Sequence, residues 1–444
     1  MYLAHAPIYE ESGLSHLHWR VRALVGAYAV SVYGNFLNLI ALSLFTYEVT
    51  GSGLGLGLLM ALRLFAGVLA GLGAGALAAR VGRRAMMIGA DLGQAVAMVV
   101  LALSATGSAP VWLLAVVVVV LGAGNTFFTV ALRSAVPVMV GHEARVRTNG
   151  QLTTSRSVAT VAGFASAAPI IELAGHSAAF AVNAATFLVS AVALSLLRPR
   201  MEEDRKGPQT APEAGAASLR QVLRAVPALL LGMVLLRGVD ALASSSHNVA
   251  LPVVADVESP GDPALFMTQF WASWAVGTFL AHQLLKRRHA SWSEGRWGAY
   301  AFAVGTCVMS VSFVLAFTGP APLLLMAVAG VAGLADGFTE IVYTSRLQAA
   351  PDRERSRLFG LSATAETSGF ALGMVAAAAA LEMWPALAVV GLFHGMALCA
   401  ALAFLLLSLA ARRRMIEQPY EKPSHSEGAN THGPCTRTGP VPRA

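Results

Sequence analysis

Twelve long apolar segments follow one another along the chain, and this repetition constrains the fold more than any other feature. A membrane-spanning helix needs about 20 predominantly apolar residues, and each segment reaches that length. We expect helices near 23–47, 53–79, 85–106, 109–132, 150–172, 176–197, 225–254, 264–285, 297–318, 321–345, 359–381 and 384–411. Because 56% of the residues are hydrophobic and only 12% are charged, the sequence predicts an all-α integral membrane protein with twelve transmembrane helices. It argues against a water-soluble enzyme.

Lys and Arg occupy alternate connections between these segments. They occur after the second, fourth, sixth, eighth and tenth segments and on both flanks of the helical region, whereas the connections after odd-numbered segments contain none. Cytoplasmic loops of membrane proteins are enriched in Lys and Arg because these residues resist translocation. The pattern therefore predicts that both termini are cytoplasmic in a multi-pass protein of the inner (plasma) membrane. We attribute the net charge of +7 to this topology and expect no nucleic-acid partner.

A long connection rich in Pro, Ala and Glu divides the chain into two halves. The expected organisation is a cytoplasmic N-terminal segment (1–22), a six-helix half (23–197), a cytoplasmic linker (198–224), a second six-helix half (225–411) and a disordered cytoplasmic tail (412–444). A weak internal repeat supports this division, because GAGNTFF at 122–128 resembles GLADGFT at 333–339. Two repeated, pseudo-symmetric halves are typical of transporters with a substrate site at the interface of the halves, near the bilayer midplane.

The connection between the second and third segments carries the most specific motif. The stretch GALAARVGRRAMMIGADLGQA resembles the loop signature G-x-L-A-D-R-x-G-R-R of the major facilitator superfamily. The matching positions are Gly75, Leu77, Ala78, Arg80, Gly82, Arg83 and Arg84. The Asp of the signature is replaced by Ala79. The stretches YEVTGSGLGLGLLMALRLFAGVLAG, AFAVNAATFLVSAVAL and RLQAAPDRERSRLFGLSA are similar to the drug-efflux branch of that superfamily, which includes macrolide exporters.

The resemblance implies a secondary active transporter that exports an amphipathic drug or natural product by alternating access, coupled to protons. Two departures bear on proton antiport. The Gly-Asp pair of the family's first helix is Gly34 and Asn35 here, and the antiporter signature of the fifth helix is reduced to Gly163 and Phe164, followed by Pro169. The alternatives are a metabolite or siderophore transporter and, more distantly, a non-transporting membrane sensor or membrane enzyme.

Ionisable residues inside the expected spans are candidates for function. They are Arg63, Asp91, Arg156, Arg237, Asp240, Asp336, Glu340 and Glu366. A charge at the centre of a lipid-facing helix costs about 2.5–3.5 kcal/mol, so these residues must pair, be neutralised or line a wet cavity. We predict gating or structural roles for Arg63, Asp91, Arg156 and Glu366, together with the residues of the loop signature.

Polar residues three, four or seven positions apart share one face of a helix, and such stripes predict the lining of a central cavity. The candidate substrate or proton residues are Asn35, Asn38, Asn125, Asp240, His247, Asp336 and Glu340. Their helices correspond to the cavity-lining helices of the resembling family. The alternative is that small polar residues join helices together, and that Arg237 and Asp240, three residues apart, neutralise each other.

Asp336 and Glu340 are the first choice for a proton or cationic-substrate site. They share a helix face that carries no basic residue, and two carboxylates close together in a low dielectric tend to hold a proton between them. No His/Cys cluster indicates a metal site and no Walker loop occurs, so we expect no metal, no cofactor and no ATP drive. The expected partners are a small-molecule substrate, the proton and the lipid bilayer, for a monomeric protein that is not an enzyme.

Overall fold

The computed structural model of the protein describes residues 9–105, 107, 109–197, 228–259, 261–287, 297–348 and 352–417, and the regular elements within them are α-helices. They are α1 (Tyr9–Thr50), α2 (Gly53–Val81), α3 (Arg83–Ser104), α4 (Val111–Leu197), α6 (Ala228–Glu258), α7 (Pro263–Arg287), α8 (Trp297–Ala316), α9 (Pro322–Gln348), α10 (Asp352–Leu381) and α11 (Ala386–Glu417). The expected linker 198–224 lies outside the described residues.

Ten helical segments within the described residues are long and apolar enough to cross a membrane. Helices suit this environment because a lipid interior offers no water to the backbone, and a helix satisfies its N–H and C=O groups internally. The helix α7 is not among the ten, although its 25 residues would reach across a bilayer. One of the ten segments, Gly150–Leu196, has 47 residues, about twice the length that one crossing needs.

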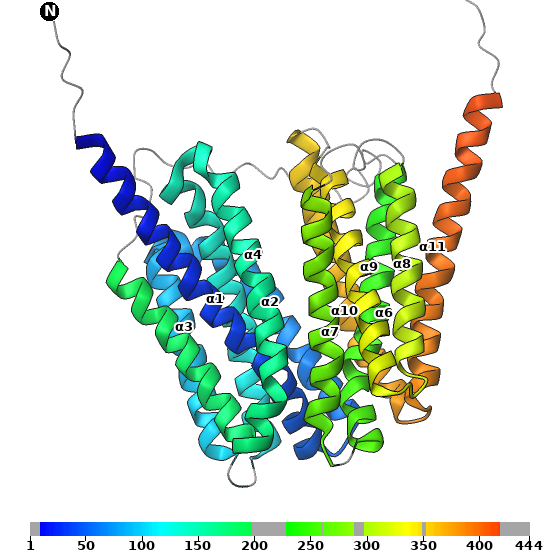
Figure 1. Ribbon diagram of the computed structural model, residues 1–444, viewed down its shortest axis with the longest axis horizontal. Helices are drawn as coiled ribbons and strands as arrows, with labels where there is room; N and C mark the ends of the chain where they lie inside the picture. The colour runs from blue at the N-terminus through cyan, green and yellow to red at the C-terminus, as the bar shows by residue number, and fades with distance from the viewer. Residues whose placement is uncertain are drawn as a thin grey trace, which may run out of the picture.

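Gly175 divides this long segment near its middle. Its φ angle is 75°, and a right-handed helix of L-residues requires negative φ, so glycine is the residue that tolerates this conformation. The cyan-to-green segment that includes it passes back and forth within one part of the molecule (Figure 1). The position matches the boundary between the two spans expected at 150–172 and 176–197.

The helices form two groups, α1–α4 and α6–α11, which meet at the end of the bundle opposite to the chain termini (Figure 1). Two hydrophobic clusters are shared between the groups at that end. One joins Leu56 of α2 to Ala378 of α10, and the other joins Phe164 of α4 to Trp271 of α7. Towards the termini, in contrast, each group has its own cluster, one around Met87 and one around Phe302.

A hydrogen bond and a ring contact reinforce the shared end. The backbone N–H of Leu54 donates to Glu382 Oε1 at 3.1 Å, where the first turn of α2 leaves free N–H groups that favour an acidic partner. The rings of Phe164 and Trp271 stack with their centroids 5.5 Å apart. The two halves are therefore closed against each other at the end that carries the acidic connections.

The internal repeat is visible in how helices approach each other. A Cβ atom on Gly122 of α4 would collide with the backbone carbonyl of Arg63 in α2, and one on Gly333 of α9 would collide with that of Trp274 in α7. The two glycines are separated in the sequence by the same offset as Arg63 and Trp274. The α2–α4 and α7–α9 packings are therefore equivalent, as the repeat at 122–128 and 333–339 predicts.

Two helices extend past the expected span ends. The helix α1 begins at Tyr9, inside the segment expected at 1–22, and α11 continues to Glu417, past the start of the tail expected at 412–444. The last residues of α11 include Arg412–Arg414. Residues 1–8 and 418–444 lie outside the described residues.

Candidate functional site

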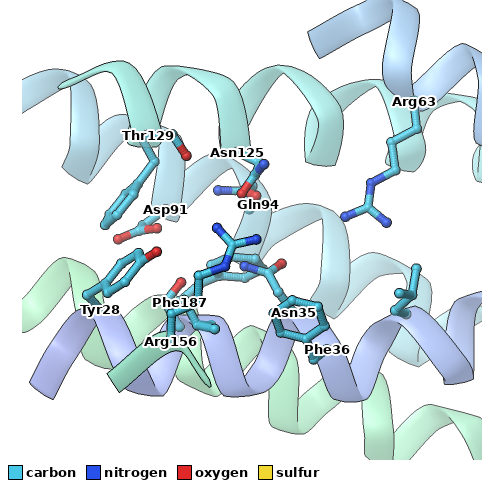
Figure 2. Close-up of a pocket in the computed structure, with 14 residues that line it drawn as sticks. Tyr28, Asn35, Phe36, Arg63, Asp91, Gln94, Asn125, Thr129, Arg156 and Phe187 are labelled. Atoms are coloured by element: carbon cyan, nitrogen blue, oxygen red, sulfur yellow. The ribbon is translucent and has the colours of Figure 1, made fainter. Parts of the chain in front are cut away.

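A cavity of about 170 Å³ lies among α1, α2, α3 and α4, and Figure 2 shows its lining. We call it the N-terminal cavity. Its polar and charged lining residues include Ser31, Asn35, Arg63, Asp91, Gln94, Asn125, Thr129 and Arg156. Tyr28, Phe36, Phe128 and Phe187 contribute aromatic surface. The cavity therefore offers charged, hydrogen-bonding and apolar groups together, as a site for an amphipathic molecule requires.

Close helix packing holds the polar groups in place. Gly122 allows α4 to lie directly against the backbone of Arg63. Two residues further on, a Cβ atom on Gly124 would lie 2.7 Å from the side chain of Gln94. A larger residue at either position would push α2 or α3 away from α4 and displace the side chain that lines the cavity.

The two arginines of the N-terminal cavity have no acidic partner within 4 Å among the described residues. The guanidinium of Arg156 lies 5.9 Å from the ring centroid of Phe36, a cation–π contact. Figure 2 shows Arg63 and Arg156 pointing into the same space from opposite sides, with the amides of Asn125 and Gln94 beside Arg156. The arginines thus face the cavity and not an ion-pair partner from this part of the chain.

Several acceptors of the cavity are also unpaired. Asp91 and Gln94 are each 1% exposed. Within the described residues, Gln94 Oε1 and Asn35 Oδ1 have no hydrogen-bond partner, and the Asp91 carboxylate lies near the Ser190 hydroxyl. Because buried polar groups normally find a partner, these atoms are candidates to bind a molecule in the cavity.

The C-terminal half accommodates charge differently. Arg237 of α6 is buried and contacts three carboxylates: Glu340 of α9 at 2.6 Å, Glu366 of α10 at 3.3 Å and Asp240 of its own helix at 3.4 Å. We call these four residues the Arg237 cluster. The local pairing of Arg237 with Asp240 predicted from their spacing is present, and two further helices join it. The cluster therefore ties α6, α9 and α10 together.

Tyr343 supports this cluster from below the guanidinium. Its ring centroid lies 5.9 Å from Arg237 Cζ, and its hydroxyl donates to Ser362 Oγ at 2.7 Å. Glu340 also accepts a hydrogen bond from Thr344 Oγ1 at 3.3 Å. The side chains of Glu340 and Glu366 are 47% and 45% exposed, so one side of the cluster remains accessible.

Asp336 and Glu340, expected to act together, have different surroundings. Glu340 is bound by Arg237, a basic residue from another helix that the sequence of α9 does not reveal. Asp336 is half-buried and lies close enough to Arg237 to interact with it electrostatically. In the part of the chain that the structure describes, it forms no ion pair within 4 Å. Asp336 is thus the less constrained acid of the two.

His247 lies away from both charged sites, in an aromatic cluster. Its Nδ1 is 3.1 Å from Nε2 of His394 in α11, and both residues are buried. The imidazole of His247 stacks on Phe313 with centroids 3.8 Å apart. Among the described residues there is no group of three or more His, Cys, Asp or Glu arranged to hold a metal ion.

The remaining predicted residues are not among those that line the N-terminal cavity. Asn38 is fully buried, and its amide atoms lack partners among the described residues. Gly82 links α2 to α3 with a φ of 85°, which explains the glycine of the loop signature. Arg84 donates from Nε to Leu194 O at 2.9 Å and from a terminal nitrogen to Ser195 O at 2.7 Å, and so caps the end of α4. Arg80 is exposed and Arg83 half-buried at this connection, and Gly75 lies within α2.

The structure adds residues that the sequence interpretation missed. Gln94 lines the N-terminal cavity, and its spacing of three from Asp91 places both on one face of α3, a signal that was available. Phe36 follows Asn35 and supplies the ring beneath Arg156. His394 is isolated among apolar residues of α11, and no local pattern pairs it with His247.

Comparison with known proteins gives the family. A curated relative, the uncharacterized MFS-type transporter YjbB of Bacillus subtilis (strain 168), is 24% identical over 280 residues, which cover 63% of this chain and 68% of the relative. The nucleoside transporter NupG superposes with a TM-score of 0.69 at 12% identity and covers 87% of this chain and 98% of its own. The peptide transporter POT, solved in complex with sulfate, gives a TM-score of 0.65 at 15% identity, over 89% of this chain and 95% of its own.

A bacterial homologue of the human lysosomal transporter Spinster, in an inward-facing and unoccupied conformation, gives a TM-score of 0.63 at 14% identity, over 92% of this chain and 99% of its own. These structural similarities establish a shared fold of multi-pass membrane transporters. Residues 24–345 match the Major Facilitator Superfamily, and they make up most of the chain. The chain therefore belongs to the Major Facilitator Superfamily.

Proposed function

We propose that the protein is a twelve-helix secondary transporter of the inner (plasma) membrane that exports an amphipathic small molecule, a drug or natural product, in exchange for protons. The count of twelve follows from the ten candidate spans, from α7 and from division of the segment Gly150–Leu196 at Gly175. An even count leaves both termini on one side. The arginines of the connections favour the cytoplasm for that side, with the protein acting as a monomer.

The distribution of hydrophobic clusters supports alternating access. The halves share two clusters at the end with the acidic connections, and each keeps a separate cluster at the end with the termini. Rocking of one half against the other would break the shared contacts and form new ones between the separate clusters. With cytoplasmic termini, the conformation described here is the one open to the inside.

The observation that carries the proposal is the N-terminal cavity itself. It places charged and amide groups beside aromatic rings inside an otherwise apolar helix bundle. Such a combination suits cargo that is partly polar and partly apolar. Intramembrane charges of this kind mark transport pathways in membrane proteins.

Proton coupling is assigned to the acids of α9. Asp336 has no ion-pair partner within 4 Å among the residues described, and Glu340 contacts both Arg237 and Thr344. A carboxylate that can bind and release a proton as the halves move would couple the proton gradient to cargo movement. The membrane potential supplies about 2.3 kcal/mol per charge per 100 mV for this step.

The test is efflux of fluorescent amphipathic dyes from cells with and without the protein, before and after an uncoupler collapses the proton gradient. We expect dye accumulation to fall in cells that carry the protein and to recover when the uncoupler is added. Efflux that persists after the uncoupler would overturn proton coupling. Equal accumulation in both cell lines, across cationic, neutral and anionic dyes, would overturn the assignment as an exporter.

A metabolite transporter is the second candidate, because two arginines and three amides make the N-terminal cavity more polar than an apolar drug requires. The structurally similar NupG and POT are described as nucleoside and peptide transporters. Uptake of radiolabelled nucleosides, dipeptides and organic acids into proteoliposomes separates this candidate from drug export.

A further inference from the structure

The strongest unassigned feature of the molecule is the set of guanidinium groups in the N-terminal cavity. Arg63 comes from α2 and Arg156 from α4, and both line the same cavity of about 170 Å³. Neither has an acidic partner within 4 Å among the described residues. An arginine inside a membrane protein costs about 2.5–3.5 kcal/mol at an exposed central position. Two such residues at one cavity therefore indicate a function that requires positive charge.

We propose that the N-terminal cavity binds the single carboxylate of an amphipathic cargo, with Arg63 and Arg156 as the residues that recognise its charge. This inference rests on the proposed transport function and specifies its substrate class. The planar guanidinium presents paired N–H donors that match the two oxygens of a carboxylate. Asn125 and Gln94 line the same cavity beside Arg156 (Figure 2) and offer amide donors to the same group.

The charge of the lining favours one negative charge on the cargo. Two arginines stand against one aspartate, Asp91, which leaves one positive charge on the cavity when Asp91 is ionised. A monoanion neutralises this charge, whereas a dianion such as a phosphate monoester would add repulsion with the Asp91 carboxylate. A cationic cargo would be repelled by the two arginines, which carry charge of the same sign.

The apolar part of the cargo has its own surface in the same cavity. Phe36 lies under the Arg156 guanidinium, and Tyr28 and Phe128 stack with centroids 6.4 Å apart. Phe187 completes the aromatic lining. An aromatic or aliphatic body can pack against these rings while its acid group faces the arginines. This arrangement predicts recognition of aromatic monocarboxylates rather than small inorganic anions.

The test uses four probes that share a naphthalene ring: the anion of 2-naphthylacetic acid (2-naphthylacetate), the methyl ester of that acid, 2-(2-naphthyl)ethylamine and 2-naphthyl phosphate. Binding to the purified full-length protein in lipid nanodiscs is measured by titration calorimetry, with no gradient imposed. We expect 2-naphthylacetate to bind about tenfold more tightly than the ester, as charged hydrogen bonds of this kind allow. The phosphate and the amine should bind more weakly than the carboxylate.

Substitutions assign the effect to the two residues. Arg63→Gln and Arg156→Gln should each lower affinity for 2-naphthylacetate about tenfold and leave affinity for the ester unchanged. Arg156→Lys should retain part of the affinity, because it keeps the charge and loses the paired donors. Arg22→Gln is the matched control, since Arg22 is exposed on α1 outside the cavity. Size-exclusion profiles identify any variant that fails to fold.

The outcomes separate this proposal from the transport assignment. Equal affinity for acid and ester, a preference for the amine or the phosphate, absence of binding by all four probes, or unchanged carboxylate affinity in both folded glutamine variants would each overturn the carboxylate site. Selective carboxylate binding without proton-driven efflux would keep the site and overturn the proposed export. Proton-driven efflux without carboxylate selectivity would keep the proposed export and overturn the carboxylate site.

Discussion

The two halves of the molecule pack their helices alike, yet they hold charge in opposite ways. The equivalence of Gly122 and Gly333 aligns Arg63 with Trp274 and, at the same offset, Asn125 with Asp336. Amides and arginines therefore line the N-terminal half where the C-terminal half has acids and a tryptophan.

The α1–α4 and α6–α10 packings are also equivalent. A Cβ atom on Gly163 of α4 would lie 2.6 Å from Tyr33 O in α1, and one on Gly369 of α10 would collide with Gly238 O in α6. This equivalence aligns Asn35 with Asp240. The two halves thus share the helix packing, while their polar residues differ. Three C-terminal acids share ion pairs with Arg237, and the N-terminal arginines have no such partner within the described residues.

The difference teaches that an intramembrane arginine can be structural or ligand-binding, and that its neighbours decide which. Arg237 is enclosed by three carboxylates and joins three helices. Arg156 contacts a ring and lines an accessible cavity. Removal of the first should damage the fold, and removal of the second should damage only recognition.

The largest expected effect is on Arg237→Gln. The substitution leaves Asp240 buried beside Glu340 and Glu366 without a cation. Breaking a buried ion pair costs about 3–5 kcal/mol, and we expect the lower end, about 3 kcal/mol, because Glu340 and Glu366 are half-exposed. The measurement is the thermal unfolding temperature and the monodisperse yield of the detergent-purified protein.

The double variant Arg237→Gln/Glu340→Gln tests whether the unpaired carboxylates cause the loss of stability, since it removes one of them. We expect it to recover part of the lost stability. If Arg237→Gln unfolds at the temperature of the unmodified protein, the cluster is not structural and the contrast between the halves fails.

The next largest expected loss of stability is that of His394→Leu, which tests a pair of polar side chains without an ion pair. The substitution leaves Nδ1 of His247 without its partner inside an aromatic cluster. An unsatisfied buried polar group costs about 1–3 kcal/mol, so the unfolding temperature should fall. The double variant His247→Phe/His394→Leu removes both polar groups and should restore part of the stability. Equal loss in the single and double variants would show that packing, and not the hydrogen bond, determines the effect.

Much of the fold could be predicted from the sequence, because its causes are local. Apolar length identifies the helical spans, whereas the orientation that the alternating arginines indicate stays a prediction. The loop signature places a glycine where the backbone needs the positive φ of Gly82. The repeat at 122–128 and 333–339 marks the glycines that bring equivalent helices together.

The partners within the site could be predicted only in part. The spacing of Arg237 and Asp240 shows a local pair, but Glu340 and Glu366 reach Arg237 from helices more than 100 residues away. The contact of His247 with His394 depends in the same way on how α6 and α11 pack. Helix periodicity assigns a residue to a face, whereas the residue opposite that face is set by tertiary packing.

A third prediction concerns proton coupling in the C-terminal half. Asp336 has no ion-pair partner among the residues the structure describes, so Asp336→Asn should lower uncoupler-sensitive dye efflux about tenfold, equivalent to about 1.4 kcal/mol, while membrane insertion is unchanged. Glu340→Gln should have a smaller effect on coupling, because Arg237 already holds that carboxylate. Full uncoupler-sensitive efflux by Asp336→Asn would remove this residue from the coupling mechanism.

The smallest expected effect on stability is that of Arg156→Gln, which removes an arginine from the N-terminal half as Arg237→Gln does from the C-terminal half. The substitution leaves no known acid unpaired and removes only a contact with Phe36, so the free energy of unfolding should change by less than about 0.5 kcal/mol, as for substitutions that disturb no buried network. The same thermal scans that report on Arg237→Gln measure it. A loss as large as that of Arg237→Gln would mean that Arg156 also neutralises an acid, and both halves would then treat charge alike. A stable variant with lower carboxylate affinity would instead fix Arg156 as a recognition residue, since its charge serves the cargo and not the fold.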